Sequence, residues 1–593
     1  MKHKRILAAA LSAMMLVSLL PAAVSANEGT TTKNTAYKDL NPRTEIYMVS
    51  ETKSWDYPYY GAKNEPKSGV LYGRTDLGGT LPGSTRYGMV NAEENANESV
   101  LGHYYGSNSW NGSYSLEYWS YLYGPTLKQG NHAFLVYLNF DNEGNDCGPI
   151  VSGVYDDALI RDFTYLNGMD FPVFLRIGGE VNTWTTPAAP KDFIAAYQHI
   201  AKLAQTYAPN AALVFSPNFS SAHLVDMDTF YPGDAYVDWV GCSLYYNKYH
   251  SNPSVKDAFG GTGIYGDALL NVQQTVNLAA LHKKPIIATE GGSSNKFNGQ
   301  DISNEAAERM SKAYAYLPMV YPQIKAIVAS DYGVGNEKTD YTFYNNSVVT
   351  AAYRKAIANS AVYLDDYSGS RPYYTKLSAA KTNWQGTVEL AAYSYAANKL
   401  SCGWYVDGKL MKTATEYPFT YRLDTSTLAG GTHTVTAKFS NGATKSYSFG
   451  VQTKTAMPTD DVLTVNGKVQ TPTIYKIDDS NFFKIRDIAA LLSGSSRQFE
   501  VGYDEKTGVT ITSGKPYTMT GTELTGSATG GNRMAAASDD RLYYNGAPLE
   551  LTVYKINDSN YFKLRDLGQA LDFYVGYDPN TGVTISGDKG YEK

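Results

Sequence analysis

The stretch PVFLRIGGEVNTWTTPAAPKDFIAAYQHIAKLAQTYAPNAALVFSPN, residues 172–218, decides the fold that the sequence predicts for the first large domain. It begins with a short apolar run, continues with a helical pattern over 192–208 and ends in a second apolar run at 212–218. A strand, a helix and a strand in this order indicate a parallel α/β fold. The apolar residues of the helical pattern share one face of a helix: Phe193, Ile194, Tyr197, Ile200, Ala201 and Ala204.

The same alternation of apolar runs and helical patterns extends from about Gly69 to Leu364. Eight runs predict strands, at residues 69–75, 99–106, 132–140, 172–179, 212–218, 236–245, 285–292 and 325–333. Further helical patterns cover 267–283 and 304–317. Eight strands with intervening helices in a segment of roughly 300 residues fit a (β/α)₈ TIM barrel. We therefore predict that residues 27–365 form such a domain.

The N-terminus has the pattern of a secretory signal peptide. Lys2, Lys4 and Arg5 form a positive region, an apolar stretch follows over 6–20, and Val24-Ser25-Ala26 supplies a small-residue cleavage site. The apolar stretch is short for a membrane span. We assign residues 1–26 to a signal peptide and expect a secreted, extracellular protein without membrane insertion, which its other domains could attach to the cell surface.

Charge and cysteine content exclude several classes of function. The net charge is −6 and no basic stripe is present, which argues against nucleic acid as a partner. The three cysteines form no CxxC pair, and the sequence contains no HExxH motif and no calcium loop. We therefore expect no metal and no cofactor. A Cys147–Cys242 disulfide is possible, but three buried or free thiols are the favoured interpretation.

Beyond residue 365 the pattern changes to short strands and turns without a helical period. Residues 366–455 contain CGWYVDGKLM and GGTHTVTAKFSNGATKSYSFGV, which predict an immunoglobulin-type (Ig-like) β-sandwich. This segment resembles the bacterial Ig-like modules of secreted enzymes, in which a WYVDGK-like hairpin and a GTHTVTA strand recur.

The last region contains a repeat. YKIDDSNFFKIRDIAALL (475–492) returns as YKINDSNYFKLRDLGQAL (554–571), and VGYDEKTGVTIT (501–512) returns as VGYDPNTGVTIS (575–586). An Asn-Gly hairpin precedes each copy, so each is predicted to be an α+β unit of hairpin, strand, short helix and hairpin. Residues 456–593 resemble stalk repeats related to the N-terminal domain of copper amine oxidases. They contain no histidine or cysteine, so we expect a spacer or an attachment to a cell-wall or surface glycan, without copper chemistry.

Two glutamates follow predicted barrel strands directly. Glu180 ends the fourth strand in FPVFLRIGGEVNTW, and Glu290 ends the seventh in KKPIIATEGGSS. The carboxyl ends of barrel strands surround the active site, so both side chains are expected there. Glycoside cleavage requires one protonated and one ionised carboxyl group. A single glutamate after a strand is more often an ion-pair or capping residue, but two at these strands favour catalysis.

The barrel sequence resembles glycoside hydrolase family 26 of the clan A barrels. The motifs are RIGGEVNTW, TFYPGDAYVDWVGCSLYY (229–246) and KKPIIATEGG, within roughly residues 100–335. The resemblance implies that Glu180 is the acid/base and Glu290 the nucleophile. It further implies substrate-site roles for Arg176, Asn182, Trp184 and either Tyr245 or Tyr246.

Other candidates rest on their position alone. His103 follows the second strand and either contacts substrate or is a structural histidine, and Tyr332 follows the eighth strand as a candidate subsite residue. Arg176 is open to a second interpretation, an ion pair inside the barrel without catalytic consequence.

Two positions depart from the family pattern. Gly179 replaces the histidine that usually precedes the acid/base, and the aromatic residue expected after the eighth strand is not clear in IVASDYG. Substrate identity therefore cannot be transferred from the family's mannanases.

The sequence thus predicts a retaining glycoside hydrolase that acts on a β-linked polysaccharide, with mannan as the first candidate. Other β-glucans, xylans and a bacterial matrix polysaccharide stay open. The alternative is an inactive glycan-binding or cell-surface structural protein, in which Gly179 marks the loss of activity. The two retained carboxylates favour the enzyme.

Overall fold

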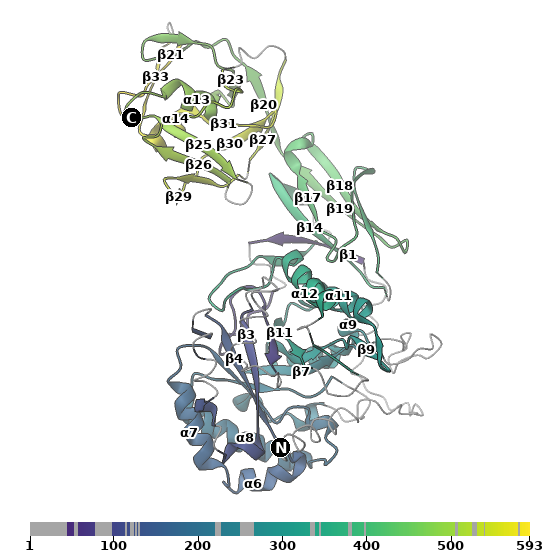
Figure 1. Cartoon of the computed structure of the whole chain (residues 1–593). Coiled ribbons are helices and arrows are strands. Elements are labelled where there is room, and N and C mark those ends of the chain that lie inside the picture. Colours follow the sequence, from purple (N-terminus) through teal and green to yellow (C-terminus); the bar gives the residue numbers. More distant parts are fainter. Residues whose placement is uncertain are drawn as a thin grey trace.

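The protein is described by a computed structural model (Figure 1). It describes residues 44–51, 57–76, 98–112, 115–118, 124, 127–128, 131–219, 227–248, 266–332, 339–342, 346–377, 382–396, 399–504, 508–524, 531–538, 540–578 and 582–592. The predicted signal peptide lies outside these residues. No helix in the described ranges combines the length and the apolar content that crossing a membrane requires.

Eight parallel strands close into a barrel in the order β11-β2-β3-β4-β5-β6-β7-β8, which confirms the predicted fold class. The strands are β2 (Leu71–Asp76), β3 (Val100–Gly106), β4 (Ala133–Asn139), β5 (Val173–Ile177), β6 (Ala212–Phe215), β7 (Trp239–Tyr245), β8 (Ile286–Gly292) and β11 (Ile324–Asp331). Because all neighbours are parallel, their carboxyl ends meet at one rim. Each coincides with one of the eight predicted strands.

The barrel strands are apolar on both faces because both faces are buried. Along β4, Leu135 and Tyr137 pack inside the barrel, and Phe134 and Val136 pack against the outer layer. The period of two therefore decides which side chains enter the barrel. This alternation matters below, where one strand departs from it.

Helices cover the outside of the barrel. They are α4 (Ser107–Trp110), α6 (Cys147–Val151), α7 (Asp156–Asn167), α8 (Pro190–Tyr207), α9 (Ala268–Asn271), α10 (Gln273–His282), α11 (Ser303–Val320) and α12 (Ser347–Asn359). The predicted apolar face of α8 is buried, although Ile194 is half-exposed. The single helix predicted over 267–283 is divided at Val272 into α9 and α10.

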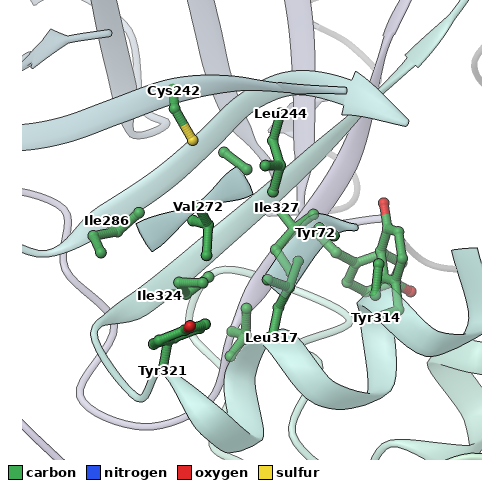
Figure 2. Packing of buried hydrophobic residues seen from close by; sticks show 14 of the residues in the cluster. Tyr72, Cys242, Leu244, Val272, Ile286, Tyr314, Leu317, Tyr321, Ile324 and Ile327 are labelled. Atoms are coloured by element: carbon green, nitrogen blue, oxygen red, sulfur yellow. The ribbon is translucent and has the colours of Figure 1, made fainter. Parts of the chain in front are cut away.

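Figure 2 shows how this layer packs on the barrel. The outer faces of β7, β8 and β11 contribute Leu244, Ile286 and Ile327 to an apolar cluster that also contains Leu317 of α11. Cys242 lies in the same apolar cluster, and the other two cysteines are also buried and free. The interpretation as buried thiols is therefore confirmed.

A β-sandwich follows the barrel. One sheet has the order β12-β1-β14-β17 and the other β13-β19-β18-β15-β16. The strands are β12 (Tyr373–Lys376), β14 (Thr387–Ser394), β17 (Tyr421–Asp424), β13 (Thr382–Trp384), β19 (Thr444–Val451), β18 (Gly431–Phe439), β15 (Cys402–Val406) and β16 (Lys409–Ala414). Trp404 of β15 is fully buried and donates its indole N–H to the Phe419 carbonyl at 2.9 Å. These sheets confirm the predicted sandwich.

One sandwich strand comes from the N-terminal side of the barrel. Strand β1 (Thr44–Ser50) lies between β12 and β14 and is antiparallel to both. Ser50, at the end of β1, stands opposite Tyr373, at the start of β12. The barrel strands lie between these two residues in the sequence, so the chain leaves the sandwich and returns to it at adjacent positions of one sheet. The sequence analysis did not anticipate this strand, which lies within residues 27–365.

Glu45 of β1 joins the two sheets of the sandwich. Its carboxylate contacts Lys376 of β12 at 3.0 Å and Lys445 of β19 at 3.2 Å. Burial alone would raise the pKa of Glu45, but the two ammonium groups bring it below its ordinary value. The N-terminal strand is therefore tied to both sheets by charge as well as by backbone pairing.

The C-terminal repeats fold as the predicted α+β units. The first contains β21 (Leu463–Val465), β22 (Lys468–Gln470), β23 (Ile474–Ile477), β24 (Ser480–Lys484), α13 (Ile485–Leu492), β25 (Phe499–Asp504) and β26 (Gly508–Ser513). The second contains β28 (Leu542–Tyr544), β29 (Ala547–Pro548), β30 (Val553–Ile556), β31 (Ser559–Lys563), α14 (Leu564–Leu571), β32 (Tyr574–Asp578) and β33 (Gly582–Ser586). Their resemblance to the copper amine oxidase domain stays a prediction.

The two repeats interlock into one unit. The first hairpin of repeat one shares a sheet with the last hairpin of repeat two, in the order β22-β21-β33-β32, and the reciprocal sheet is β25-β26-β28-β29. With β20 (Thr453–Pro458) and β27 (Arg533–Ala537), the central strands close a second barrel. There Phe483 stands opposite Phe562, its own counterpart in the repeat. The repeats are therefore related by an approximate two-fold axis and share one core.

Candidate active site

Glu290 reaches the barrel interior through a β-bulge. In β8, Ile287 packs inside the barrel and Ala288 outside, so strict alternation would send Glu290 outward. The register between β7 and β8 shifts here, from Cys242 opposite Ala288 to Ser243 opposite Glu290. The bulge leaves one extra residue in β8 and turns Glu290 inward.

The Glu290 carboxylate is buried and fully engaged. Its Oε1 accepts hydrogen bonds from Arg176 Nη2 and from Ser243 Oγ, both at 2.7 Å. Its Oε2 accepts from the Tyr104 hydroxyl and, at 3.4 Å, from the Tyr245 hydroxyl. A guanidinium and three hydroxyl groups therefore donate to this one side chain. These contacts hold the carboxylate in one orientation at the barrel rim.

Arg176 lies inside the barrel on β5. Its guanidinium also donates to Ser243 Oγ at 2.9 Å, and its Cζ lies 5.2 Å from the centroid of the Tyr137 ring. Burial would lower the pKa of Arg176, but Glu290 raises it above its ordinary value. The side chain is therefore a permanent cation paired with Glu290. The sequence analysis left two interpretations of Arg176 open, a role in the substrate site and an ion pair inside the barrel.

Gly179 makes room for that guanidinium. A Cβ atom at this position would lie 2.1 Å from Arg176 Cζ and 2.4 Å from each terminal nitrogen. A side chain at position 179 would therefore require the Arg176 guanidinium to shift from its observed position.

Glu180 follows β5 in a left-handed backbone conformation, with φ of 62°. This conformation is uncommon for a residue with a Cβ and is held here by the surroundings. The Glu180 amide donates to the Ser216 carbonyl at 2.9 Å, and the Thr183 amide donates to the Glu180 carbonyl at 2.8 Å. The turn aims the carboxyl group at the rim, where Asn218 Nδ2 donates to Oε1 at 2.6 Å.

The two carboxyl groups have opposite environments. Burial and the nearby charge of Glu290 raise the pKa of Glu180 above its ordinary value. Arg176, Ser243 and Asn218 offset part of this rise. The arrangement favours a protonated Glu180 beside a carboxylate that is paired with Arg176, and acid-assisted cleavage of a glycosidic bond uses such a pair of carboxyl groups.

Tyrosines complete the site around Glu290. The Tyr104 ring stacks on Tyr137, with centroids 4.1 Å apart. The Tyr245 hydroxyl lies 3.3 Å from the Tyr332 hydroxyl and 3.2 Å from Ser330 Oγ. Tyr341 packs on both Tyr245 and Tyr332. The predicted residues Tyr245 and Tyr332 are thus brought together with Glu290.

Other predicted residues lie next to the site in different roles. The Asn182 amide group exchanges two hydrogen bonds with the backbone of Asn218, at 2.8 and 3.0 Å. Trp184 donates its indole N–H to the Gly179 carbonyl at 3.0 Å and packs on Phe140. Both therefore support the segment that carries Glu180.

Two predicted residues point away from the site. His103 is buried on the outer face of β3, where it stacks on Phe134, and burial lowers its pKa to about 3. Tyr246 is buried near α11, and its carbonyl accepts from Arg309 Nε at 3.2 Å. In both cases the neighbour in the strand, Tyr104 or Tyr245, has the inward position, because successive side chains alternate.

Asp331 also belongs to the outer layer. It contacts Arg74 at 3.2 Å, and Arg74 in turn pairs with the buried Glu98. Within the described ranges, no three His, Cys, Asp or Glu side chains are arranged to hold a metal ion.

The sequence analysis missed Tyr104, Ser243 and Asn218. Tyr104 has the inward parity of β3, so the period of two could have identified it. Asn218 follows β6 at the same rim as the two glutamates and could have been found by the rule used for them. Ser243 lies within β7, where no feature of the sequence distinguishes it from a core residue.

Residues 401–437 match the family model described as a bacterial Ig domain. No curated protein matches the chain. Among solved structures, a double mutant of the endo-beta-1,4-mannanase from Cellulomonas fimi is 12% identical, with a TM-score of 0.39, over 68% of this chain and 99% of that one. The family 26 β-mannanase from Bacteroides ovatus is 16% identical, with a TM-score of 0.36, over 50% and 90% of the two chains.

The catalytic domain of the family 26 endo-beta-1,4-mannanase from Bacillus sp. JAMB-750 is 17% identical, with a TM-score of 0.38, over 54% of this chain and 94% of that one. The solved structures to which this chain is similar thus include mannanases of glycoside hydrolase family 26, and its segment 401–437 matches a bacterial Ig domain.

Proposed function

We propose that the chain is an extracellular retaining glycoside hydrolase that cleaves a β-linked polysaccharide by double displacement. The observation that carries the proposal is the pair of carboxyl groups at the barrel rim. Glu290 accepts four hydrogen bonds, one from a guanidinium, and Glu180 has a raised pKa beside it. A fixed carboxylate and a protonated carboxyl group are the two reactants of this mechanism.

In the first step, a Glu290 carboxylate oxygen forms a bond to the anomeric carbon while the glycosidic bond breaks. The Glu180 proton moves to the departing oxygen, so that the leaving sugar is released as an alcohol. In the second step, Glu180 takes a proton from water, whose oxygen attacks the anomeric carbon and releases Glu290. Arg176 and Ser243 hold Glu290 in place throughout both steps.

The substrate is a polysaccharide, and a β-linked mannan is the first candidate because of the family resemblance. The tyrosines around Glu290 offer flat apolar faces and hydroxyl groups, which suit the stacking and hydrogen bonding of sugar rings. The interlocked repeats of residues 456–593 would serve as a spacer or attach the enzyme to a cell-wall or surface glycan. Residues 27–365, 366–455 and 456–593 remain our proposed domain limits, with β1 as a contribution to the second.

Export is part of the proposal. Signal peptidase would cleave after Ala26, so N-terminal sequencing of the protein from the culture medium should begin at Asn27. Retention of residues 1–26 in the cell-associated protein would contradict this assignment.

The test of function is the release of reducing sugar from β-mannan, β-glucan, xylan and bacterial exopolysaccharides. We expect activity on one of them that Glu180→Gln and Glu290→Gln each abolish, whereas Glu550→Gln, an exposed glutamate in the last repeat, leaves it unchanged. Proton NMR of the first product should show the β-anomer. Binding without cleavage, unaffected by either substitution, would instead indicate a glycan-binding scaffold.

A further inference from the structure

Asn218 connects three elements at the barrel rim. It follows β6, it forms a parallel bridge with Ser243 of β7, and its Nδ2 donates to Glu180 Oε1 at 2.6 Å. Its backbone is held by Asn182, which accepts from the Asn218 amide at 2.8 Å and donates to its carbonyl at 3.0 Å. The side chain that reaches Glu180 therefore starts from a fixed backbone.

The contact distinguishes the two oxygens of Glu180. An oxygen that accepts an amide N–H at this distance cannot direct an O–H group along the same line, because two hydrogens would meet. Because the carbonyl oxygen of a neutral carboxyl group is the stronger acceptor, the contact favours Oε1 as the carbonyl oxygen and Oε2 as the oxygen that carries the acidic proton of Glu180. The amide group also favours the ionised carboxylate that forms once this proton has left.

We propose that Asn218 is a positioning residue that confines the transferable proton of Glu180 to Oε2, and that Asn182 acts through it. The inference rests on the proposed function and deepens it. In the first step the Oε2–H bond breaks, the proton binds the glycosidic oxygen, and the pair of electrons of the C–O bond leaves with that oxygen. In the second step the proton of the attacking water returns to Oε2.

A proton-positioning role has a selective consequence. A leaving group such as 2,4-dinitrophenolate departs without protonation, so its cleavage does not depend on where the Glu180 proton lies. Polysaccharide cleavage does depend on it. A general acid contributes about 10²–10⁴-fold to the rate, so misplacing its proton should remove about tenfold or more.

The experiment compares kcat/KM of wild type and Asn218→Ala on the polysaccharide and on the 2,4-dinitrophenyl glycoside of the same sugar. We expect a loss of about tenfold or more on the polysaccharide and less than about threefold on the activated glycoside. Asn182→Ala should show the same selectivity with a smaller loss. Asn210→Ala, exposed before the opposite end of β6, should change neither.

Equal losses on both substrates would overturn the proposal, since they would indicate a general structural role. A higher kcat/KM of Asn218→Ala on the polysaccharide would overturn it too. Such a result would mean that the amide oxygen of Asn218 accepts a hydrogen bond from the Glu180 O–H group and retains the proton. Carbon-13 NMR titration of Glu180 gives an answer that does not require turnover: Asn218→Ala should raise the pKa of this carboxyl group, and an unchanged value would contradict the contact. Activity that survives Glu180→Gln would refute the proposed function itself.

Discussion

At the scale of single residues, the candidate site depends on which side chains are absent as much as on which are present. Arg176 and Gly179 are three positions apart, yet the guanidinium of one occupies the volume that a Cβ of the other would need. The same guanidinium donates to Glu290 at 2.7 Å. Gly179 is therefore coupled to Glu290 through Arg176.

Replacing Gly179 with alanine should displace Arg176 from Glu290. We expect kcat/KM on the polysaccharide to fall about tenfold or more, since a charge-assisted hydrogen bond contributes roughly 1.5–3 kcal/mol. A double-mutant cycle measures the coupling: in an Arg176→Ala background, Gly179→Ala should have little further effect. Gly148→Ala is the matched control, because a Cβ at Gly148 meets no atom within 4 Å. Additive losses in the cycle would mean that Gly179 and Arg176 act independently, which would contradict the proposed coupling.

The pH dependence follows from Glu180. Its pKa is raised, first by burial and then by Glu290, and the proposed acid acts only when protonated. Activity should therefore fall as pH rises through this raised pKa, on the alkaline limb of the kcat/KM profile. Glu290→Gln removes the neighbouring negative charge, so NMR titration should show a lower pKa of Glu180 in that variant. A value that does not move would contradict the electrostatic coupling of the two groups.

At the scale of secondary-structure elements, two strands have decisive irregularities. The bulge in β8 turns the Glu290 side chain into the barrel. The backbone irregularity extends to Gly291, whose φ is 142°. Strand β1 precedes the barrel in the chain but pairs with β12 and β14 of the sandwich. The site thus depends on a local defect in one strand, and the sandwich depends on a strand that is remote in sequence.

Shortening Ile46 of β1 should destabilise the sandwich. Ile46 is buried in the large apolar cluster, and Ile→Ala in a core costs about 2–5 kcal/mol. Hydrogen exchange of Ile46→Ala should show faster exchange in β12 and β14 and unchanged exchange in the C-terminal unit. Val469→Ala, 66% exposed, should leave protection in the sandwich as in wild type. Unchanged exchange in β14 after Ile46→Ala would mean that β1 is dispensable.

At the scale of the whole molecule, the barrel segment is preceded in the sequence by β1 and followed by β12, and these two strands pair in one sheet of the sandwich. Arg541 of the C-terminal unit also contacts Glu51, which follows β1, at 2.7 Å. Both side chains are largely exposed, so this ion pair contributes little to stability. The two C-terminal repeats form a single structural unit, because each of two sheets combines one hairpin from each repeat.

One repeat alone should therefore not remain a monomer. A fragment of residues 453–527 would lack the partners of β21, β24 and β26, and a second copy could supply them about the same two-fold axis. Sedimentation should show a dimer for this fragment and a monomer for residues 453–593. A folded, monomeric single repeat would contradict the shared core.

Much of the fold could be predicted because its signals are local. The period of two in the strands, the period near 3.6 in α8 and the Asn-Gly hairpins of the repeats are properties of neighbouring residues. Glu180 and Glu290 were identified because a polar residue directly after a buried strand reaches the barrel rim. The placement of Tyr246 and His103 could not be predicted by that rule, since a shift of one residue reverses the direction of a side chain.

The sequence by itself determined the eight barrel strands, the sandwich, the duplicated units and the two carboxyl groups. Only the tertiary structure decided that Arg176 fills the space above Gly179, that Asn218 reaches Glu180 and that β1 joins the sandwich. The physical reason is distance along the chain. Arg176 and Glu290 are 114 positions apart, and their contact arises from barrel closure and from the bulge in β8, which no local pattern encodes.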